Sequence, residues 1–86
     1  MKEEKIFSVA EYFSDQLEEF QNFTDAKEGY EISRKYIDLI ESEFKATETH
    51  YETLESMLPN GDFTITIKTF YGTYEFEGFN RTNLIH

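Results

Sequence analysis

Metal chemistry in this chain would have to come from histidine and carboxylate side chains, because the sequence has no cysteine. His50 lies among Glu48, Glu52 and Glu55, and the other histidine is the last residue, His86. A helical zinc site needs a second histidine at helical spacing, as in an HExxH pattern, and the sequence has none. We therefore expect His50 to be a solvated or structural side chain, and we expect no bound metal or other cofactor.

Signatures of covalent catalysis and of nucleotide binding are missing from the sequence. It contains no G-x-S-x-G elbow, no P-loop and no G-x-G-x-x-G run, and its four glycines are scattered. Carboxylate pairs are abundant, but 18 acidic residues in a chain of 86 produce such pairs by chance. These features predict a protein that is not an enzyme.

Carboxylates between residues 31 and 55 form the most regular polar pattern in the chain. They recur at steps of three, four and seven residues, which would place many of them on one side of a helix. We define the acidic stripe as Asp38, Glu41, Glu48, Glu52 and Glu55. Such a stripe is either an ordinary solvated face or a row of carboxylates that enters a basic groove in place of nucleic-acid phosphates.

The C-terminal third alternates β-branched and aromatic residues around Gly72, which predicts an antiparallel hairpin over residues 63–79. A two-residue loop at Tyr71 and Gly72 would place Ile67 opposite Phe76. A three-residue loop would instead place Lys68 opposite Phe76. The two-residue loop puts one set of side chains in the core, namely Phe63, Ile65, Ile67, Tyr74 and Phe76.

Four residues on the other face of this hairpin complete the candidate partner-binding surface. Phe70 and Phe79 are expected to be exposed beside Glu75 and Glu77. Exposed aromatic side chains next to carboxylates are typical anchors of a protein interface.

A first helix is predicted over residues 8–23. Ser8 and Glu11 have the spacing of a capping box, and an apolar stripe follows at three- and four-residue steps. Its members are Val9, Phe13, Leu17 and Phe20.

A second helix is predicted to follow an N-cap at Thr24 or Asp25. Its apolar seam has a spacing of seven residues and consists of Tyr30, Ile37, Phe44, Tyr51 and Leu58. The helix is either continuous to Leu58 or kinked near residues 45–50, and Pro59 ends it. The predicted fold is therefore one α+β domain over residues 1–86, with two N-terminal helices packed on a C-terminal antiparallel β-hairpin.

The net charge limits the choice of partner. Eighteen acidic residues against eight basic ones give a charge of −10, which predicts no direct binding to nucleic acid or to anionic membranes. A positively charged protein is the electrostatic complement. The amino terminus lacks the apolar core of a signal peptide, and residues with AT-rich codons are frequent, which favours a cytoplasmic protein of a bacterium or a phage-infected cell.

These observations favour a non-enzymatic inhibitor that binds a basic, nucleic-acid-binding surface of a nuclease or defence effector. Anti-CRISPR proteins, anti-restriction proteins and the immunity proteins of nuclease toxins share this small size and acidic charge, and some would act as partial DNA mimics. The alternative is a structural or adaptor module that forms a homodimer through the seam of the second helix. A third, weaker hypothesis is a small enzyme or metal protein that uses His50.

Overall fold

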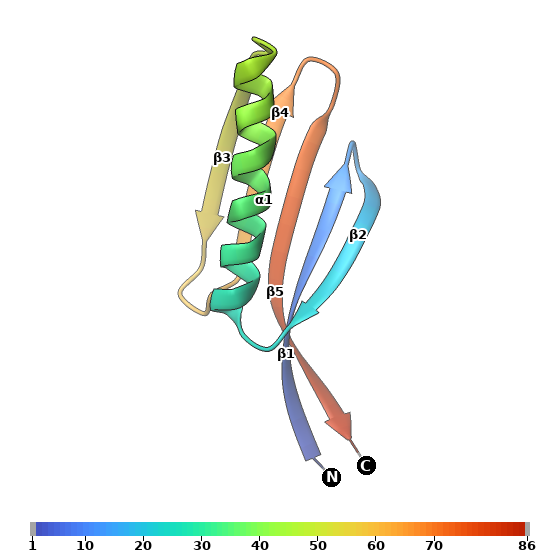
Figure 1. The fold of residues 1–86 in the computed structure, drawn as a ribbon. Coiled ribbons are helices and arrows are strands. Elements are labelled where there is room, and N and C mark those ends of the chain that lie inside the picture. The colour runs from blue at the N-terminus through green and yellow to red at the C-terminus, as the bar shows by residue number, and fades with distance from the viewer. Residues whose placement is uncertain (1, 86) are drawn as a thin grey trace.

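The structure, a computed structural model, describes the backbone of residues 2–85 and the side chains of residues 6–81. Its elements are β1 (Lys2–Phe13), β2 (Gln16–Phe23), α1 (Ala26–Ala46), β3 (Tyr51–Met57), β4 (Phe63–Thr69) and β5 (Thr73–Ile85). The five strands form one antiparallel sheet in the spatial order β2-β1-β5-β4-β3, and α1 runs along one face of it (Figure 1). The predicted fold of two helices on a hairpin is therefore wrong.

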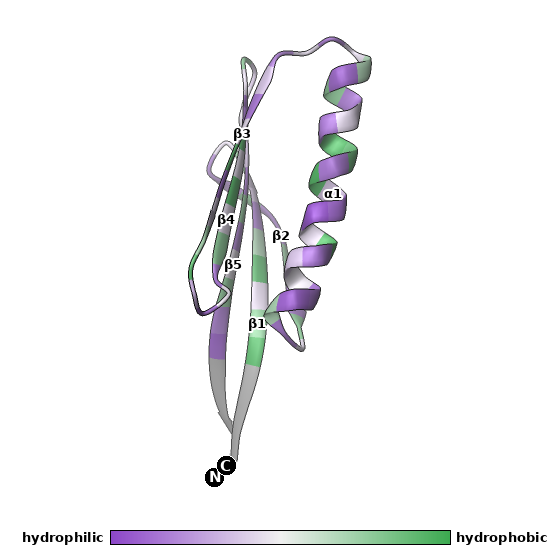
Figure 2. Ribbon diagram, turned by 90° about the vertical axis from the view of Figure 1, so that its left-hand side faces the viewer, coloured by the Kyte–Doolittle hydropathy of each residue, from purple (hydrophilic) through white to green (hydrophobic). Residues whose placement is uncertain are grey.

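The two faces of the sheet differ, and we name them the helix face, which α1 covers, and the open face opposite. Figure 2 shows α1 on one side of the sheet, and no second helix or strand of residues 2–85 lies over the other side. The buried core fills the helix face and consists of Phe7, Val9, Ile37, Phe44, Phe63, Ile65, Ile67 and Phe76. Alternation along each strand sends the intervening side chains to the open face.

Residues 8–23 form a β-hairpin where a helix was predicted. Val9 and Phe13 lie four positions apart, a spacing that also places two side chains on the same face of a strand. Leu17 and Phe20 lie only three apart, yet both are on the open face, because a β-bulge shifts the register between β1 and β2. The bulge thus reproduces a helix-like spacing inside a strand pair.

The turn between β1 and β2 consists of Ser14 and Asp15, which both have positive φ angles of 49° and 69°. Positive φ at both central residues is what a type I′ hairpin turn requires, and its twist matches that of the flanking strands. The backbone N–H of Ser14 also donates to the Thr73 carbonyl at 2.8 Å, which ties this turn to the start of β5. The turn lacks the Asn-Gly signal that identifies most hairpins of this type in a sequence.

The start of α1 agrees with the predicted cap. The Asp25 side chain accepts a hydrogen bond from the Glu28 N–H at 2.8 Å, and the Thr24 hydroxyl donates to the Glu28 carboxylate at 2.8 Å. One turn in, Gly29 allows the helix to approach β1, because a Cβ at this position would lie 2.6 Å from Cδ1 of Phe7. The cap and this close approach fix where α1 crosses the sheet.

Helix α1 ends at Ala46, inside the segment of residues 45–50 where a kink was predicted. The chain then continues as strand β3 and not as helix. The Thr49 and Glu48 N–H groups donate to the Phe44 and Lys45 carbonyls at 2.8 and 3.2 Å, with Glu48 at a φ of 56°. These bonds form a Schellman motif, which ends a helix with one left-handed residue. Tyr51 then turns back to pack on Phe44.

The predicted seam is consequently divided among several elements. Ile37 and Phe44 are buried on α1, whereas Tyr51 belongs to β3 and Leu58 to the turn that follows. Ile37 and Phe44, the central part of the seam that the homodimer alternative needs, are therefore packed within the chain, whereas Leu58 is exposed. Residues 58–62 were predicted to end the second helix, but they form the turn that joins β3 to β4, in which the Leu58 N–H donates to the Asp62 carbonyl at 2.8 Å.

The hairpin of β4 and β5 is present, and its register differs from the predicted one by two residues. Ile67 lies opposite Tyr74 and Ile65 opposite Phe76, because the turn residues are Phe70 and Tyr71, closed by a Thr69 N–H to Gly72 carbonyl bond of 2.9 Å. A shift of two residues leaves every side chain on its predicted face. The core assignment of Ile65, Ile67 and Phe76 is therefore confirmed.

Candidate partner-binding surfaces

The acidic stripe does not exist as a single row. Asp38 and Glu41 are on α1, Glu48 lies in the turn after it, and Glu52 and Glu55 are on β3. Because β3 alternates, Glu52 points to the open face opposite Lys68 and Glu55 points to the helix face. The stripe failed as a prediction because the helix that would have aligned it ends at Ala46.

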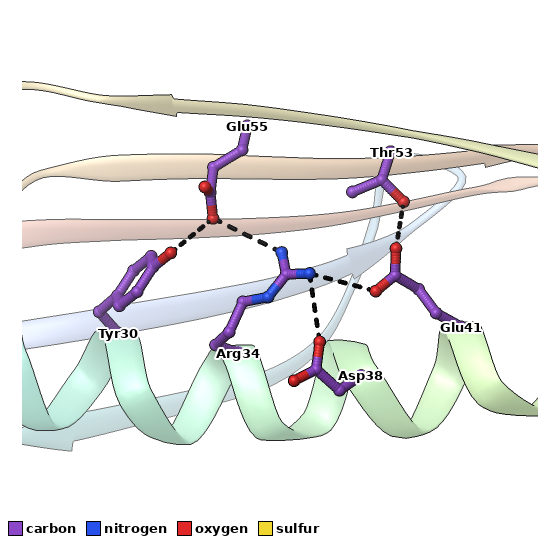
Figure 3. Close-up of polar contacts among 6 residues, drawn as sticks. All are labelled: Tyr30, Arg34, Asp38, Glu41, Thr53 and Glu55. Atoms are coloured by element: carbon purple, nitrogen blue, oxygen red, sulfur yellow. Dashed lines mark hydrogen bonds and ion pairs between the residues drawn. The ribbon is translucent and has the colours of Figure 1, made fainter.

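Three of these carboxylates instead surround Arg34 (Figure 3). The Arg34 guanidinium lies 3.1 Å from the Asp38 carboxylate, 3.2 Å from that of Glu41 and 3.6 Å from that of Glu55. Because Glu55 is on β3 and the others are on α1, the cluster links the helix to the edge strand. One arginine neutralises part of the negative charge that was predicted to face a partner.

Two hydroxyl groups complete this cluster. The Thr53 hydroxyl donates to the Glu41 carboxylate at 2.8 Å, and the Tyr30 hydroxyl donates to that of Glu55 at 2.8 Å (Figure 3). The hydrogen bond to Glu55 is the main cause that raises the pKa of Tyr30 above its usual value. Through Glu41 and Glu55, the cluster therefore connects α1 to β3.

The open face carries the other half of the predicted surface. Glu75, Glu77 and Phe79 lie on alternate positions of β5, as predicted, and they share that face with exposed side chains from neighbouring strands. We define the open-face patch as Leu17, Phe20, Leu54, Glu75, Glu77 and Phe79. The sheet brings together in this patch residues that are far apart in the sequence.

Aromatic contacts and small residues give the open-face patch its shape. Phe20 and Phe79 have ring centroids 6.2 Å apart, and the Arg81 guanidinium carbon lies 5.5 Å from the Phe20 ring centroid. Beneath them, Ser8 and Ala10 of β1 are almost fully buried, and the Ser8 hydroxyl donates to the Asn22 side chain at 2.6 Å. Small residues on β1 thus allow the two rings to lie close to the sheet.

The two carboxylates of the patch disturb one another. Partial burial raises the pKa of Glu75 above its usual value, and the neighbouring Glu77 raises it further by charge repulsion and a hydrogen bond. The ion pairs among the described side chains all involve Arg34, so neither carboxylate has a cationic partner there. A cation brought by another molecule would relieve this repulsion.

Phe70 is exposed as predicted, but the turn takes it away from the patch. It sits at the tip of the β4–β5 hairpin with 88% of its surface exposed, in contact with Tyr71 at 5.2 Å between ring centroids. It is therefore a separate apolar point at the end of the molecule. Phe20 and Leu17 were not predicted to belong to this surface, because both were placed on a helix. No sequence signal marked the bulge that turns them to the open face.

His50 lies in the turn between α1 and β3. Within the described part of the chain, no three histidine or carboxylate side chains come close enough to hold a metal ion. None of the described residues form a helix of the length and apolar character that crossing a membrane requires.

Comparison with known proteins gave no further assignment: no family model, curated protein or solved structure matches this chain.

Proposed function

We propose that this protein is a non-enzymatic inhibitor whose open face binds a basic protein surface, in particular the nucleic-acid-binding surface of a nuclease or defence effector. The observation that carries the proposal is the open-face patch, where exposed aromatic and aliphatic side chains surround two adjacent carboxylates. Such a partner would be met in the cytoplasm of a bacterial or phage-infected cell.

Electrostatics supports a cationic partner. The chain has a net charge of −10, and the only ion pairs among the described side chains lie around Arg34, on the helix face of the sheet and not on the open face. The field of the remaining carboxylates would attract a basic surface and accelerate its association. Glu75 and Glu77 would then receive the cationic groups that the chain itself does not provide.

The apolar side chains of the patch supply the short-range part of binding. Phe20, Leu17 and Leu54 are each at least two-fifths exposed although the core is closely packed. Clustered aromatic and aliphatic side chains that a partner covers usually contribute most of the binding energy at an interface. Binding by this face would cover a partner's nucleic-acid site with an acidic, aromatic surface.

The experiment begins with capture of the partner from a bacterial host lysate, followed by purification of both proteins. The protein should displace a fluorescently labelled oligonucleotide from the purified partner, as followed by anisotropy. Glu75→Gln/Glu77→Gln should slow association by about three- to tenfold at low salt and weaken its salt dependence. Phe20→Ala and Phe79→Ala should act mainly by accelerating dissociation.

The control is Glu31→Gln/Glu43→Gln, which removes the same charge from exposed positions on α1. If this control weakens binding as much as Glu75→Gln/Glu77→Gln, net charge and not the open face determines binding. If the partner keeps its oligonucleotide while the protein is bound, the inhibitory part of the proposal is wrong.

A further inference from the structure

A groove separates α1 from the β1–β2 hairpin on the helix face of the sheet. It encloses about 70 Å³, and its apolar walls are formed by Val9, Phe23, Ile32 and Phe76. This volume can hold a few water molecules or the end of one side chain. It is far below the 300 Å³ or more of a typical cofactor or drug-sized site.

Two carboxylates lie opposite each other on the neighbouring strands that form the base of this groove. Glu11 of β1 is directly opposite Glu19 of β2, and both line the cavity. Like charges directly opposite on a sheet destabilise the pair. Burial raises the pKa of Glu11 first, and repulsion from Glu19 and Glu18 raises it further. The ion pairs among the described side chains include neither carboxylate.

A largely buried serine on α1 also lines the groove. Ser33 of α1 is only 4% exposed and lines the groove, and its hydroxyl makes no hydrogen bond within the described part of the chain. No polar side-chain atom there that is fully shielded from solvent lacks a partner, so the Ser33 oxygen keeps some exposed surface. Its hydroxyl group can both accept and donate a hydrogen bond.

Tyr36 adds a second hydroxyl group at the rim. Its ring lies 5.8 Å from that of Phe76, and the negative charge of Glu11 is the main cause that raises the pKa of Tyr36. Ile32 of α1, which lines the groove, is also exposed, and so is Leu39 on the same helix. The groove thus combines apolar walls for an aliphatic stem with two carboxylates and two hydroxyl groups for a cationic end.

We propose that this groove binds the side chain of one arginine or lysine on the basic partner protein. The apolar walls would hold the methylene stem, Glu11 and Glu19 would pair with the charged end, and Ser33 would accept one of its hydrogen bonds. The partner is chosen over a small free amine because the exposed Ile32 and Leu39 offer contact area beyond the 70 Å³ cavity. This inference rests on the proposed function, since it names one residue type that the basic partner must present.

The test uses two probes of nearly equal size, N-acetyl-arginine amide and N-acetyl-citrulline amide, which differ in charge. Two-dimensional ¹⁵N NMR should show saturable shifts at Gln21, Ser33 and Tyr36 with the arginine probe at millimolar concentration. The citrulline probe should bind at least tenfold more weakly. Equal shifts with both probes, or arginine-induced shifts confined to other residues, would overturn the proposal.

Variants then separate the groove from general electrostatics. Glu11→Gln/Glu19→Gln should weaken arginine binding about tenfold, and Ser33→Ala should weaken it two- to fivefold. The matched control, Glu31→Gln/Glu43→Gln, should leave the affinity within twofold of wild type. If the control and the groove variant weaken arginine binding equally, the arginine probe is held by net charge and not by the groove, and the proposal is wrong.

The final experiment measures the affinity of the variants for the captured partner. Its result distinguishes this inference from the proposed function. Glu11→Gln/Glu19→Gln should lower partner affinity at least fivefold. If it has no effect while Glu75→Gln/Glu77→Gln still weakens binding, the groove takes only free cations and this inference is wrong, although the proposed function stands. If neither pair of substitutions affects partner binding, both are wrong.

Discussion

Arg34 is the only basic side chain among the described residues that lies within ion-pair distance of carboxylates. Its positive charge partly offsets the negative charge of three carboxylates between α1 and β3, where two hydroxyl groups also donate hydrogen bonds. Without the guanidinium, the Asp38, Glu41 and Glu55 carboxylates would face one another with no positive charge between them. Such a cluster stabilises the fold mainly by preventing repulsion.

Replacing Arg34 with Gln should lower the free energy of unfolding by about 1 to 2 kcal/mol at low salt, because three carboxylates lose their shared partner. Added salt should recover part of this loss by screening the repulsion. Urea denaturation followed by circular dichroism measures both effects.

Lys35→Gln on the same helix removes one positive charge from an exposed position and should change stability by less than about 0.5 kcal/mol. Equal losses for the two variants would mean that the cluster around Arg34 contributes nothing beyond net charge.

At the scale of the elements, the β1–β2 hairpin departs furthest from what the sequence indicates. Its turn uses Ser14 and Asp15 at positive φ, where Asn and Gly are the preferred residues. Within a helix, glycine at position 15 would cost about 1 kcal/mol relative to alanine. The same substitution therefore has opposite effects on the predicted helix and on the observed hairpin.

Ser14→Asn/Asp15→Gly should stabilise the protein by about 0.5 to 1 kcal/mol, because both residues adopt the required backbone angles with less strain. Thermal denaturation should show a higher midpoint. A lower midpoint would support the predicted helix over residues 8–23 and contradict the hairpin.

Local signals explain which elements could be predicted. The Asp25 cap and the alternation of β4 and β5 depend on neighbouring residues, so the start of α1 and the core face of that hairpin followed from the sequence. The spacing of Leu17 and Phe20 depends on a bulge, and that of Phe44 and Tyr51 on a turn between two elements. These spacings imitate a helix, and only the tertiary structure separates the two cases.

The candidate partner-binding surface was likewise predicted only where it depends on neighbouring residues. Glu75, Glu77 and Phe79 share a face because alternation along one strand is a local property. The acidic stripe was wrong because its members belong to three segments of the chain.

Across the whole molecule, carboxylates with raised pKa values make stability depend on pH. The pKa values of Glu11 and Glu75 lie above the ordinary value of 4.5, so the folded chain binds more protons than the unfolded chain just above that value. Their contribution to stability is full below the unfolded pKa and is lost as the pH rises through the folded pKa. Stability should therefore increase as the pH falls from 7 toward 4.5.

Urea midpoints at pH 7, 6 and 5 measure this dependence. Glu11→Gln/Glu75→Gln should be more stable than wild type at pH 7 and should show a smaller change with pH, because the repelling charges are already absent. An unchanged slope in this variant would show that other groups cause the pH dependence.

The position of β5 also determines how the chain must fold. It occupies the centre of the sheet, yet it is the last of the five strands to be synthesised, and its longest pairing is with β1, the first. Pairs such as Phe7 with Asn80 close very long loops, and folds dominated by such contacts form slowly, in about milliseconds to seconds. During synthesis one edge of β1 therefore remains unpaired until β5 leaves the ribosome. In that interval the nascent hairpin would be open to misassociation, and chaperones that shield exposed strand edges should increase the yield of folded protein.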